Sequence, residues 1–275
     1  MSDSTRIEQK SNLMAGKRGL ILGVANEKSI AWGIATALAE AGAEMAFTYQ
    51  NDALKKRVEP LAASTGSDMI FPCDVSDQSS LEAVIDGVKD RWDRIDFAVH
   101  AVAFSDKNEL KGRYADTSRS NFLSTVDISC FSFTALARLV APMMTEGGSL
   151  ITLTYLGAER TTPNYNVMGV AKAALEASVR YMAADLGPDN IRVNALSAGP
   201  MRTLAGSAIA DARYTYRFTE NAAPLKRNAA LEEVGRTGLY LLSNLSSGVT
   251  GETLHVDGGF HAVAIPRPNK GDTGV

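Results

Sequence analysis

Short apolar runs alternate with longer segments of helical periodicity from residue 19 almost to the end of the chain. This alternation is typical of repeated βαβ units and predicts a parallel sheet. The expected strands are residues 19–23, 44–49, 69–73, 97–101, 149–154, 192–197 and 253–256. The helical patterns between them include residues 30–40, 80–92, 122–143, 167–186 and 231–245. Right-handed crossovers would place helices on both faces, so we expect a doubly wound α/β fold with a seven-stranded parallel sheet.

Length and composition indicate one domain. A chain of 275 residues with 45% hydrophobic content can bury a substantial core, and α/β folds of this size are often a single domain. We expect that catalytic domain to span residues 15–265. Residues 1–14 are polar and mixed in charge, and residues 266–275 are rich in proline, glycine and charge. Both ends are expected to be flexible segments off the core.

Charge and cysteine content narrow the class of protein. The formal net charge is −3 and the basic residues are scattered, which argues against a nucleic-acid partner. Cys73 and Cys130 are the only cysteines, so a reducing, cytoplasmic location is expected. No apolar stretch approaches about eighteen uninterrupted residues, so no membrane association is expected. His100, His255 and His261 lack metal-ligand spacing, and no metal is expected.

A turn with two glycines follows the first expected strand. Gly23 and Gly33 can supply the tight turn and close packing that let a pyrophosphate lie over a helix N-terminus. Ser29 is placed to cap that helix and to offer a hydroxyl to a phosphate. The motif is weak alone, because the G-x-G-x-x-G spacing is absent and an ordinary strand-to-helix turn would look similar. Its place after the first strand favours a dinucleotide site of the Rossmann type.

The residues after the second and third strands indicate which dinucleotide is bound. Gln50, Asn51 and Asp52 follow the second strand, and the first cation is Lys55. NADP needs a positive group near its ribose 2′-phosphate, so NADH is expected in preference to NADPH. Asp74 follows the third strand and could reach the adenine amino group. An acid at a helix N-terminus is an equally good interpretation of Asp74.

A tyrosine and a lysine mark the expected reacting end. On a helix, Lys172 lies within roughly 20° of Tyr165 and about 10 Å along the axis, so both can face one crevice. A lysine there can hold the nicotinamide ribose and favour developing negative charge. A tyrosine hydroxyl there can donate to a substrate carbonyl oxygen. The alternative is a solvated lysine beside an interface aromatic.

Several of these motifs together resemble the short-chain dehydrogenase/reductase superfamily. They are the glycine turn, Asp-Val at residues 74–75, HAVAF after the fourth strand, SAGPMRT at residues 197–203, and VDGGF near the end. The G-x5-S-x3-G turn and the run YLGAERTTPNYNVMGVAK at residues 155–172 resemble more narrowly the NADH-dependent enoyl-acyl carrier protein reductases of type II fatty acid synthesis. That family has Tyr-x6-Lys where the superfamily usually has Tyr-x3-Lys. The resemblance covers roughly residues 13–265.

The resemblance implies reduction of the trans-2 double bond of enoyl-acyl carrier protein thioesters by NADH, the last step of fatty acid elongation. Hydride would reach the β-carbon, so charge would develop on a thioester oxygen farther along the conjugated system. A tyrosine farther from the lysine suits a thioester oxygen that lies farther from the carbon receiving the hydride. A carbonyl or alcohol dehydrogenase is disfavoured because the superfamily's usual Tyr-x3-Lys pair is absent from this helix. A dinucleotide sensor without catalysis would be expected to lack Tyr165 or Lys172.

The resemblance also assigns roles to single residues. Tyr165 would stabilise the enolate and Lys172 would anchor the nicotinamide ribose. Tyr155 would be a second active-site tyrosine lining the acyl site, although packing against the cofactor is an alternative. The substrate residues would be Ser105, Tyr155 and Tyr165. The cofactor-binding residues would be Gly23, Ser29, Ile30, Gln50, Asp74, Val75, Val102, Lys172, Met201 and Thr203.

The chain departs from the family's usual residues at two positions, and two further expectations follow from the sequence. The family often has glycine where this chain has Ala103 and alanine where it has Ser105, which puts the response to diphenyl-ether inhibitors in doubt. Residues 203–218 interrupt the helix–strand alternation and are expected to form a lid over the acyl chain, although a surface insertion is nearly as good an interpretation. The superfamily is commonly tetrameric, so a homotetramer is expected through residues 122–143, residues 167–186 and the C-terminal strand region.

Overall fold

Seven parallel strands form the centre of the structure, as expected. The computed structural model describes residues 6–207 and 210–266. The strands are β1 (Arg18–Leu22), β2 (Glu44–Tyr49), β3 (Ile70–Pro72), β4 (Phe97–His100), β5 (Gly148–Thr154), β6 (Ile191–Ala198) and β7 (Thr253–Val256). Their order in the sheet is β3-β2-β1-β4-β5-β6-β7. The order reverses between β1 and β4, and ligands of open α/β sheets bind outside the carboxyl ends at such a reversal.

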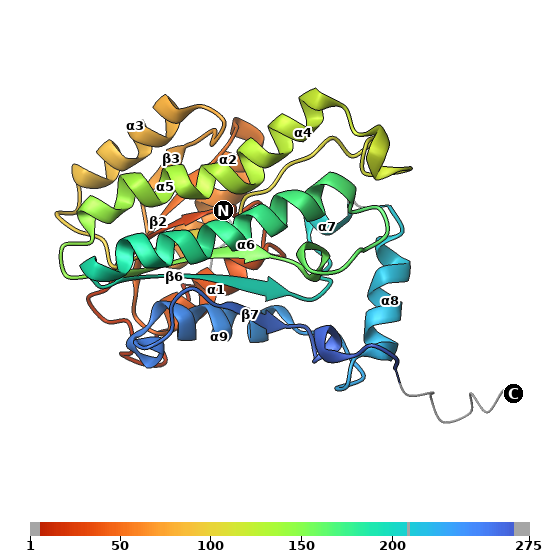
Figure 1. Ribbon diagram of the computed structural model, residues 1–275. Helices are drawn as coiled ribbons and strands as arrows, with labels where there is room; N and C mark the ends of the chain where they lie inside the picture. The colour runs from red at the N-terminus through yellow and green to blue at the C-terminus, as the bar shows by residue number, and fades with distance from the viewer. Residues whose placement is uncertain (1–5, 208–209, 267–275) are drawn as a thin grey trace, which may run out of the picture.

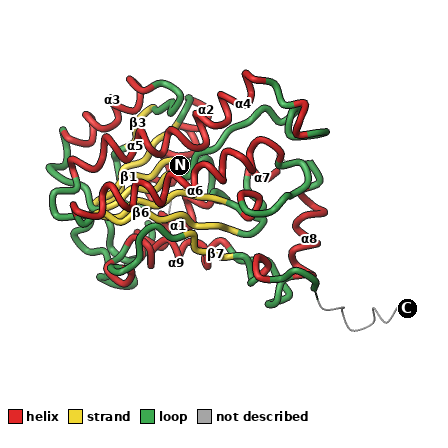
Figure 2. The backbone as a smooth tube through the Cα atoms, viewed as in Figure 1, coloured by secondary structure: helices red, strands yellow, loops and turns green. Residues whose placement is uncertain are grey.

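Helices cover both faces of the sheet (Figures 1 and 2). One face carries α3 (Gln78–Lys89), α5 (Ser132–Val140) and α6 (Asn166–Leu186). The opposite face carries α1 (Ile30–Glu40), α2 (Asp52–Ser64) and α9 (Leu231–Leu242). Because both faces are covered, inner strands such as β4 are buried along their whole length, which explains their continuous apolar sequences.

The helix expected over residues 122–143 is longer and is interrupted. It consists of α4 (Arg119–Val126), a π-helical segment η2 (Asp127–Phe131), α5 and a 3-10 turn η3 (Ala141–Met143). By length and composition alone, Arg119–Met143 could cross a membrane, with a mean hydropathy of 1.3. However, half of its most apolar 18-residue window is buried in the domain. Phe133, Leu136 and Val140 belong to a buried core cluster. That burial is the ordinary environment of a core helix.

The described part of the N-terminal segment lies against the domain. Ile7 N donates to Ser64 O at 2.8 Å, at the end of α2, and Lys10 N donates to Glu40 O at 2.7 Å, at the end of α1. Met14 is buried in the core cluster under α1. Residues 6–14 therefore make specific contacts with the ends of two helices. The expectation for residues 1–5 and for the tail beyond residue 266 concerns positions outside the described residues.

Candidate active site

The glycine turn brings the ends of β1 and β4 into close contact. Gly23 has φ +101°, and a Cβ atom there would lie 2.1 Å from the carbonyl oxygen of Ala101. Only glycine allows this approach. Gly33 lies in the tight contact between α1 and α9, where a Cβ would meet Leu231 at 2.7 Å. Both glycines thus have the steric roles that the sequence predicted for them.

Ser29 acts differently from the prediction. It occupies the N-cap position of α1, but its side chain makes no capping hydrogen bond. Its Oγ instead accepts from Ala25 N at 3.0 Å and from Asn26 N at 3.1 Å, because the turn folds back over it. The predicted capping role was wrong. The N-terminus of α1 consequently keeps backbone N–H groups without a side-chain cap, which is the arrangement that binds a pyrophosphate.

Gln50 and Asp74 meet at the ends of neighbouring strands. The Asp74 carboxylate accepts from Ser76 Oγ at 2.6 Å and from Ser76 N at 3.0 Å. These bonds lower the pKa of Asp74. The cap of α3 is Asp77, which accepts from Ser79 N at 2.9 Å. Asp74 N nevertheless donates to Ser80 Oγ in the first turn of α3 at 2.9 Å, so Asp74 lies near that helix N-terminus. The adenine contact and the acid at a helix N-terminus both stay predictions.

The remaining predicted cofactor residues follow strand ends or begin a helix at the same edge of the sheet. All are half-buried, and they are Ile30, Val75, Val102, Met201 and Thr203. Thr203 Oγ1 accepts from Gly206 N at 2.9 Å and so starts α7 (Leu204–Ser207). Because the carboxyl ends of parallel strands share one edge, the structure brings residues from five separate segments of the chain to this edge.

Tyr165 is held by an unusual backbone turn at the start of α6. Its neighbours Asn164 and Asn166 have φ +57° and φ +36°, a region that asparagine tolerates better than most residues. Asn164 Nδ2 donates to Asp211 Oδ2 at 3.0 Å, and Asn166 Nδ2 donates to Gly112 O at 3.3 Å. The sequence analysis missed these two supports. The signal was present in the triplet Asn-Tyr-Asn.

The two predicted tyrosines contact each other. The rings of Tyr155 and Tyr165 lie edge to face with centroids 5.1 Å apart. Tyr165 is 7% exposed, and burial raises its pKa above its ordinary value. Burial also raises the pKa of Tyr155. Both hydroxyls therefore keep their protons at neutral pH and can act as hydrogen-bond donors.

Lys172 is buried, so the alternative of a solvated helix lysine is wrong. It is 5% exposed, and its Nζ donates to Leu153 O at 2.7 Å. Burial lowers its pKa to about 8. Within the described part of the chain, no hydrogen bond joins Lys172 to Tyr165. One turn later, Glu176 accepts from Thr154 Oγ1 at 2.6 Å, and burial raises the pKa of Glu176. The sequence analysis did not single out Glu176.

His100 is a core histidine whose two ring nitrogens both have partners. Its Nδ1 lies 3.0 Å from Thr152 Oγ1, its Nε2 lies 2.7 Å from Ser132 Oγ, and burial lowers its pKa to about 3. Cys73 and Cys130 are buried free thiols, and burial raises the pKa of Cys73 to about 12. Such a thiol is a poor nucleophile. Among the described residues, no group of three or more His, Cys, Asp or Glu side chains could hold a metal ion.

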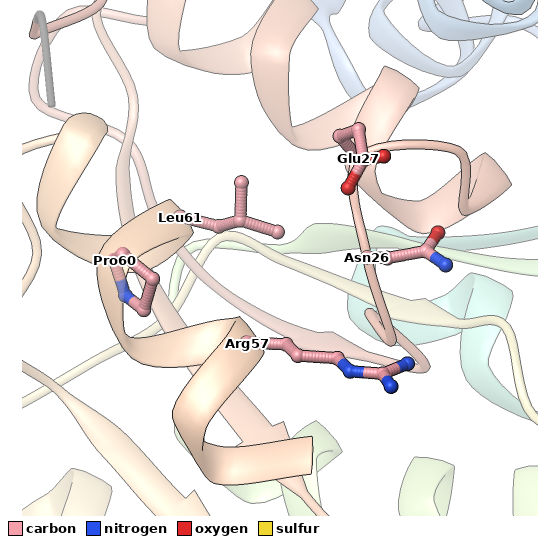
Figure 3. A pocket seen from close by; sticks show the side chains of 5 residues that line it. All are labelled: Asn26, Glu27, Arg57, Pro60 and Leu61. Carbon is pink, nitrogen blue, oxygen red and sulfur yellow. The ribbon is translucent and has the colours of Figure 1, made fainter. Parts of the chain in front are cut away.

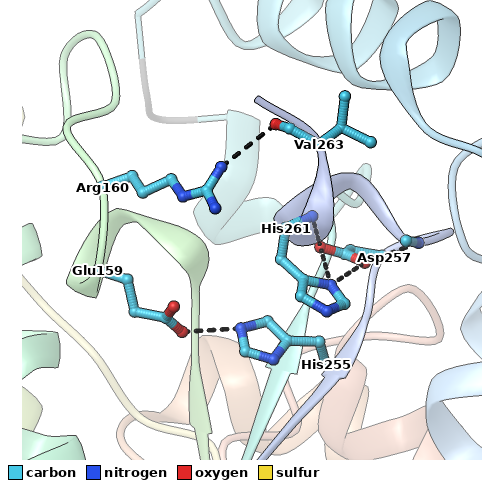
Figure 4. A network of polar contacts seen from close by, with 7 residues as sticks. Glu159, Arg160, His255, Asp257, His261 and Val263 are labelled. Atoms are coloured by element: carbon cyan, nitrogen blue, oxygen red, sulfur yellow. Dashed lines mark hydrogen bonds and ion pairs between the residues drawn. The ribbon is translucent and has the colours of Figure 1, made fainter. Parts of the chain in front are cut away.

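A polar cluster joins the loop after β5 to β7 and to the segment that follows β7 (Figure 4). His255 Nε2 lies 2.8 Å from Glu159 Oε1, and His261 Nδ1 lies 3.0 Å from Asp257 Oδ1. The two imidazole rings stack with centroids 4.1 Å apart. Glu159 is four residues beyond Tyr155, so these contacts fix the loop that follows this tyrosine.

Residues 203–218, the predicted lid, contain α7 and most of α8 (Ala212–Ala222). Residues 208–209 lie outside the described residues. Tyr214 stacks on Phe218 with centroids 6.0 Å apart, and Phe218 meets Phe260 edge to face, also at 6.0 Å. The outer face of α8 carries Arg213 and Arg217 beside these aromatic rings, over a hollow of about 460 Å³.

A second hollow of about 420 Å³ lies between the glycine turn and α2 (Figure 3). Its lining residues are Asn26, Glu27, Arg57, Pro60 and Leu61. Neither Tyr165 nor Lys172 lines it. Arg57 is a cation near the glycine turn that the sequence analysis did not consider. Glu27 lines the same hollow and carries the opposite charge.

Comparison with known proteins agrees with this geometry. Residues 23–261 match the family model described as enoyl-(acyl carrier protein) reductase. The chain is 61% identical to the enoyl-[acyl-carrier-protein] reductase [NADH] 1 of Rhizobium meliloti (strain 1021), over 97% of this chain and 98% of that protein. It is 49% identical to the enoyl-[acyl-carrier-protein] reductase [NADH] FabI of Bacillus subtilis (strain 168), over 91% of this chain and 98% of that protein.

A solved structure is similar along almost its whole length. The enoyl-(acyl-carrier-protein) reductase of Anaplasma phagocytophilum, crystallised in complex with NAD, superposes with a TM-score of 0.92 at 56% identity. The match covers 95% of this chain and 100% of that one. The chain therefore belongs to the enoyl-acyl carrier protein reductase family of the short-chain dehydrogenase/reductase superfamily.

Proposed function

We propose that this protein is an NADH-dependent enoyl-[acyl-carrier-protein] reductase, which reduces the trans-2 carbon–carbon double bond of enoyl thioesters at the end of each elongation cycle. The observation that carries the proposal is the reacting end of the site. A buried tyrosine, Tyr165, starts α6, a buried lysine, Lys172, lies two turns later, and Tyr155 packs edge-on against the first tyrosine. The relatives named as NADH-dependent enoyl reductases support the same reaction.

The residues at the carboxyl edge of the sheet fit a dinucleotide. Gly23 lets the turn after β1 approach the Ala101 carbonyl closely, and the start of α1, which has no side-chain cap, offers N–H groups to a pyrophosphate. Asp74 and Gln50 follow the ends of the paired strands β3 and β2 and suit the adenosine half. Gln50 and Asn51, where NADP would need a cation, favour NADH. Bound NADH would supply the hydride that reduces the β-carbon.

The tyrosine and the lysine have separate tasks in this proposal. Tyr165 holds its proton at neutral pH because burial raises its pKa, so its hydroxyl donates a hydrogen bond to the substrate oxygen on which negative charge develops. Lys172, with a pKa of about 8, is mainly charged at neutral pH and holds the nicotinamide ribose. Tyr155 and Ser105 line the acyl side.

We further propose that the partner delivering the substrate is acyl carrier protein, with α8 as the lid over the acyl chain. The exposed arginines of α8 suit an acidic partner, and the aromatic rings between them suit an acyl chain. We also propose a cytoplasmic homotetramer. Exposed apolar side chains on the helices expected to form its interface support this assembly, namely Leu123, Phe131 and Tyr181.

The test is to follow NADH oxidation by absorbance with a trans-2-enoyl thioester, carried on acyl carrier protein and on coenzyme A. NADPH and a 3-oxoacyl thioester serve as parallel controls. Rapid NADH loss with the enoyl substrate alone is the expected result. Activity only with the 3-oxoacyl thioester would instead indicate a carbonyl reductase. NADH binding without turnover of any substrate would indicate a sensor.

A further inference from the structure

Four polar residues of α4 and its π-helical continuation bind the loop that leaves β4. Ser129 Oγ accepts from Phe104 N at 3.0 Å and contacts Phe104 O at 3.1 Å. Thr125 Oγ1 donates to Ser105 Oγ at 2.9 Å. We call the four residues Ser118, Asn121, Thr125 and Ser129 the loop clamp.

The other two members of the clamp bind farther along the loop. Asn121 Oδ1 accepts from Asp106 N at 3.0 Å. Ser118, the N-cap of α4, donates from N and from Oγ to the two carboxylate oxygens of Glu109, each at 2.8 Å. One side of the helix thus binds the loop at residues 104, 105, 106 and 109.

The order of these contacts shows how the loop runs. Loop residues 104, 105, 106 and 109 contact helix residues 129, 125, 121 and 118, in that order, so the residue numbers increase along the loop as they decrease along the helix. Residues three and four apart lie on one face of a helix. The loop therefore runs antiparallel to α4 and is bound once at every helical turn.

Burial makes these contacts energetically important. Asn121, Thr125 and Ser129 are all buried, and a buried polar group that loses its partner costs about 1–3 kcal/mol. Asn121 Nδ2 has no hydrogen-bond partner, which leaves Asn121 Oδ1 as the group that ties this side chain to the loop. Thr125 Oγ1 also donates to Asn121 Oδ1 at 3.2 Å, so these two side chains support each other. A displaced loop would take from Ser129 its partner Phe104 and from Asn121 the bond to Asp106 N.

The clamped loop leads directly to the reacting tyrosine. Leu110, which follows the last bound loop residue Glu109, shares a buried apolar cluster with Tyr165, Val167 and Met168. Phe104 is held by two backbone hydrogen bonds, yet its side chain is 53% exposed at the carboxyl edge of the sheet. An exposed aromatic on a fixed backbone is suited to contact an apolar substrate.

We propose that the loop clamp is a positioning device that fixes residues 103–110 as the wall of the acyl site and thereby sets the affinity for the enoyl thioester. This inference rests on the proposed function. Ser105, where the family often has alanine, strengthens the clamp in this chain, because its hydroxyl accepts from Thr125 and contacts Asn121 Oδ1 at 3.3 Å. The clamp residues act through the loop and do not touch the reacting atoms.

The experiment compares the full-length protein with Thr125→Val, which keeps the shape of the side chain but removes its hydroxyl. Thr125→Ser restores the hydroxyl, and Ser129→Ala frees the Phe104 N–H. Ser124→Ala is the matched control, because Ser124 lies next to Thr125 and makes no clamp contact. For Thr125→Val and Ser129→Ala, the KM for the enoyl thioester should rise about fivefold, with KM for NADH unchanged. Thr125→Ser and Ser124→Ala should stay within about twofold of the natural protein.

A second readout does not depend on activity. Hydrogen–deuterium exchange of the peptide covering residues 104–109 should become at least about fivefold faster in Ser129→Ala and Thr125→Val, and not in Ser124→Ala. If the exchange rate of this peptide is unchanged in folded variants, the proposal that the clamp holds the loop is wrong. An equal rise of KM for both substrates would overturn it as well, because that indicates general damage. If the natural protein does not turn over enoyl thioesters, the proposed function fails, while exchange still decides whether the clamp holds the loop.

Discussion

Replacing Lys172 by methionine should stabilise the fold while it removes the proposed contact with the nicotinamide ribose. The lysine is buried, and its pKa falls from the ordinary 10.5 to about 8 because burial disfavours the charged form. That fall corresponds to about 3 kcal/mol of unfavourable free energy for the charged lysine at neutral pH. Methionine fills a similar volume without charge. The loss of the hydrogen bond to Leu153 O offsets part of the gain, so we expect the free energy of unfolding to rise by about 2 kcal/mol.

The lowered pKa of Lys172 also determines how the stability of the natural protein changes with pH. Because the pKa of Lys172 is lower in the folded state, the unfolded chain binds more protons between pH 8 and pH 10.5. The stability of the natural protein therefore rises with pH across that window. The penalty is complete below pH 8 and absent above pH 10.5. The advantage of the methionine variant should shrink accordingly as the pH approaches that upper limit.

The assay is guanidinium unfolding followed by circular dichroism at neutral pH and near pH 10. Protein concentration is held constant and NADH is omitted, because ligand binding and assembly also shift stability. Lys56→Met, a change at an exposed lysine of α2, should alter stability by no more than about 0.5 kcal/mol. A Lys172→Met protein that is less stable at neutral pH, or whose difference from the natural protein does not change with pH, would refute the reasoning.

Four other changes test the rest of the site. Tyr165→Phe should leave a folded protein with kcat for the enoyl thioester about 10²- to 10³-fold lower; normal kcat would contradict the role of the hydroxyl. Gly23→Ala should lower the unfolding temperature and weaken NADH binding, because its Cβ would lie 2.1 Å from Ala101 O; a normal melting curve with normal NADH affinity would show that the contact is tolerated. Asp74→Asn should keep the fold and weaken NADH binding several-fold in a fluorescence titration, whereas unchanged affinity would exclude an adenine contact. His100→Gln should reduce the loss of stability between pH 6.5 and pH 3 in acid unfolding, because the natural imidazole has its pKa lowered to about 3; identical acid unfolding curves would contradict its neutral, buried state.

The sequence by itself determined the fold and which polar residues follow each strand. The alternation of apolar runs with helical periodicity is a local property, so the seven strands and most helices follow from it. Since parallel strands share one carboxyl edge, the residues after each strand are expected at one site. The seven-residue interval between Tyr165 and Lys172 predicted that both would face one crevice.

The tertiary structure decided what depends on contacts between distant parts of the chain. Ser29 bonds the preceding turn in place of the helix, and Lys172 lies in a buried environment that lowers its pKa. The partners in the loop clamp are 25 residues apart at Phe104 and Ser129, and Glu159 and His255 are 96 residues apart. Hydrogen bonds and desolvation depend on spatial neighbours, and sequence periodicity states only which face a residue occupies, not what it meets there.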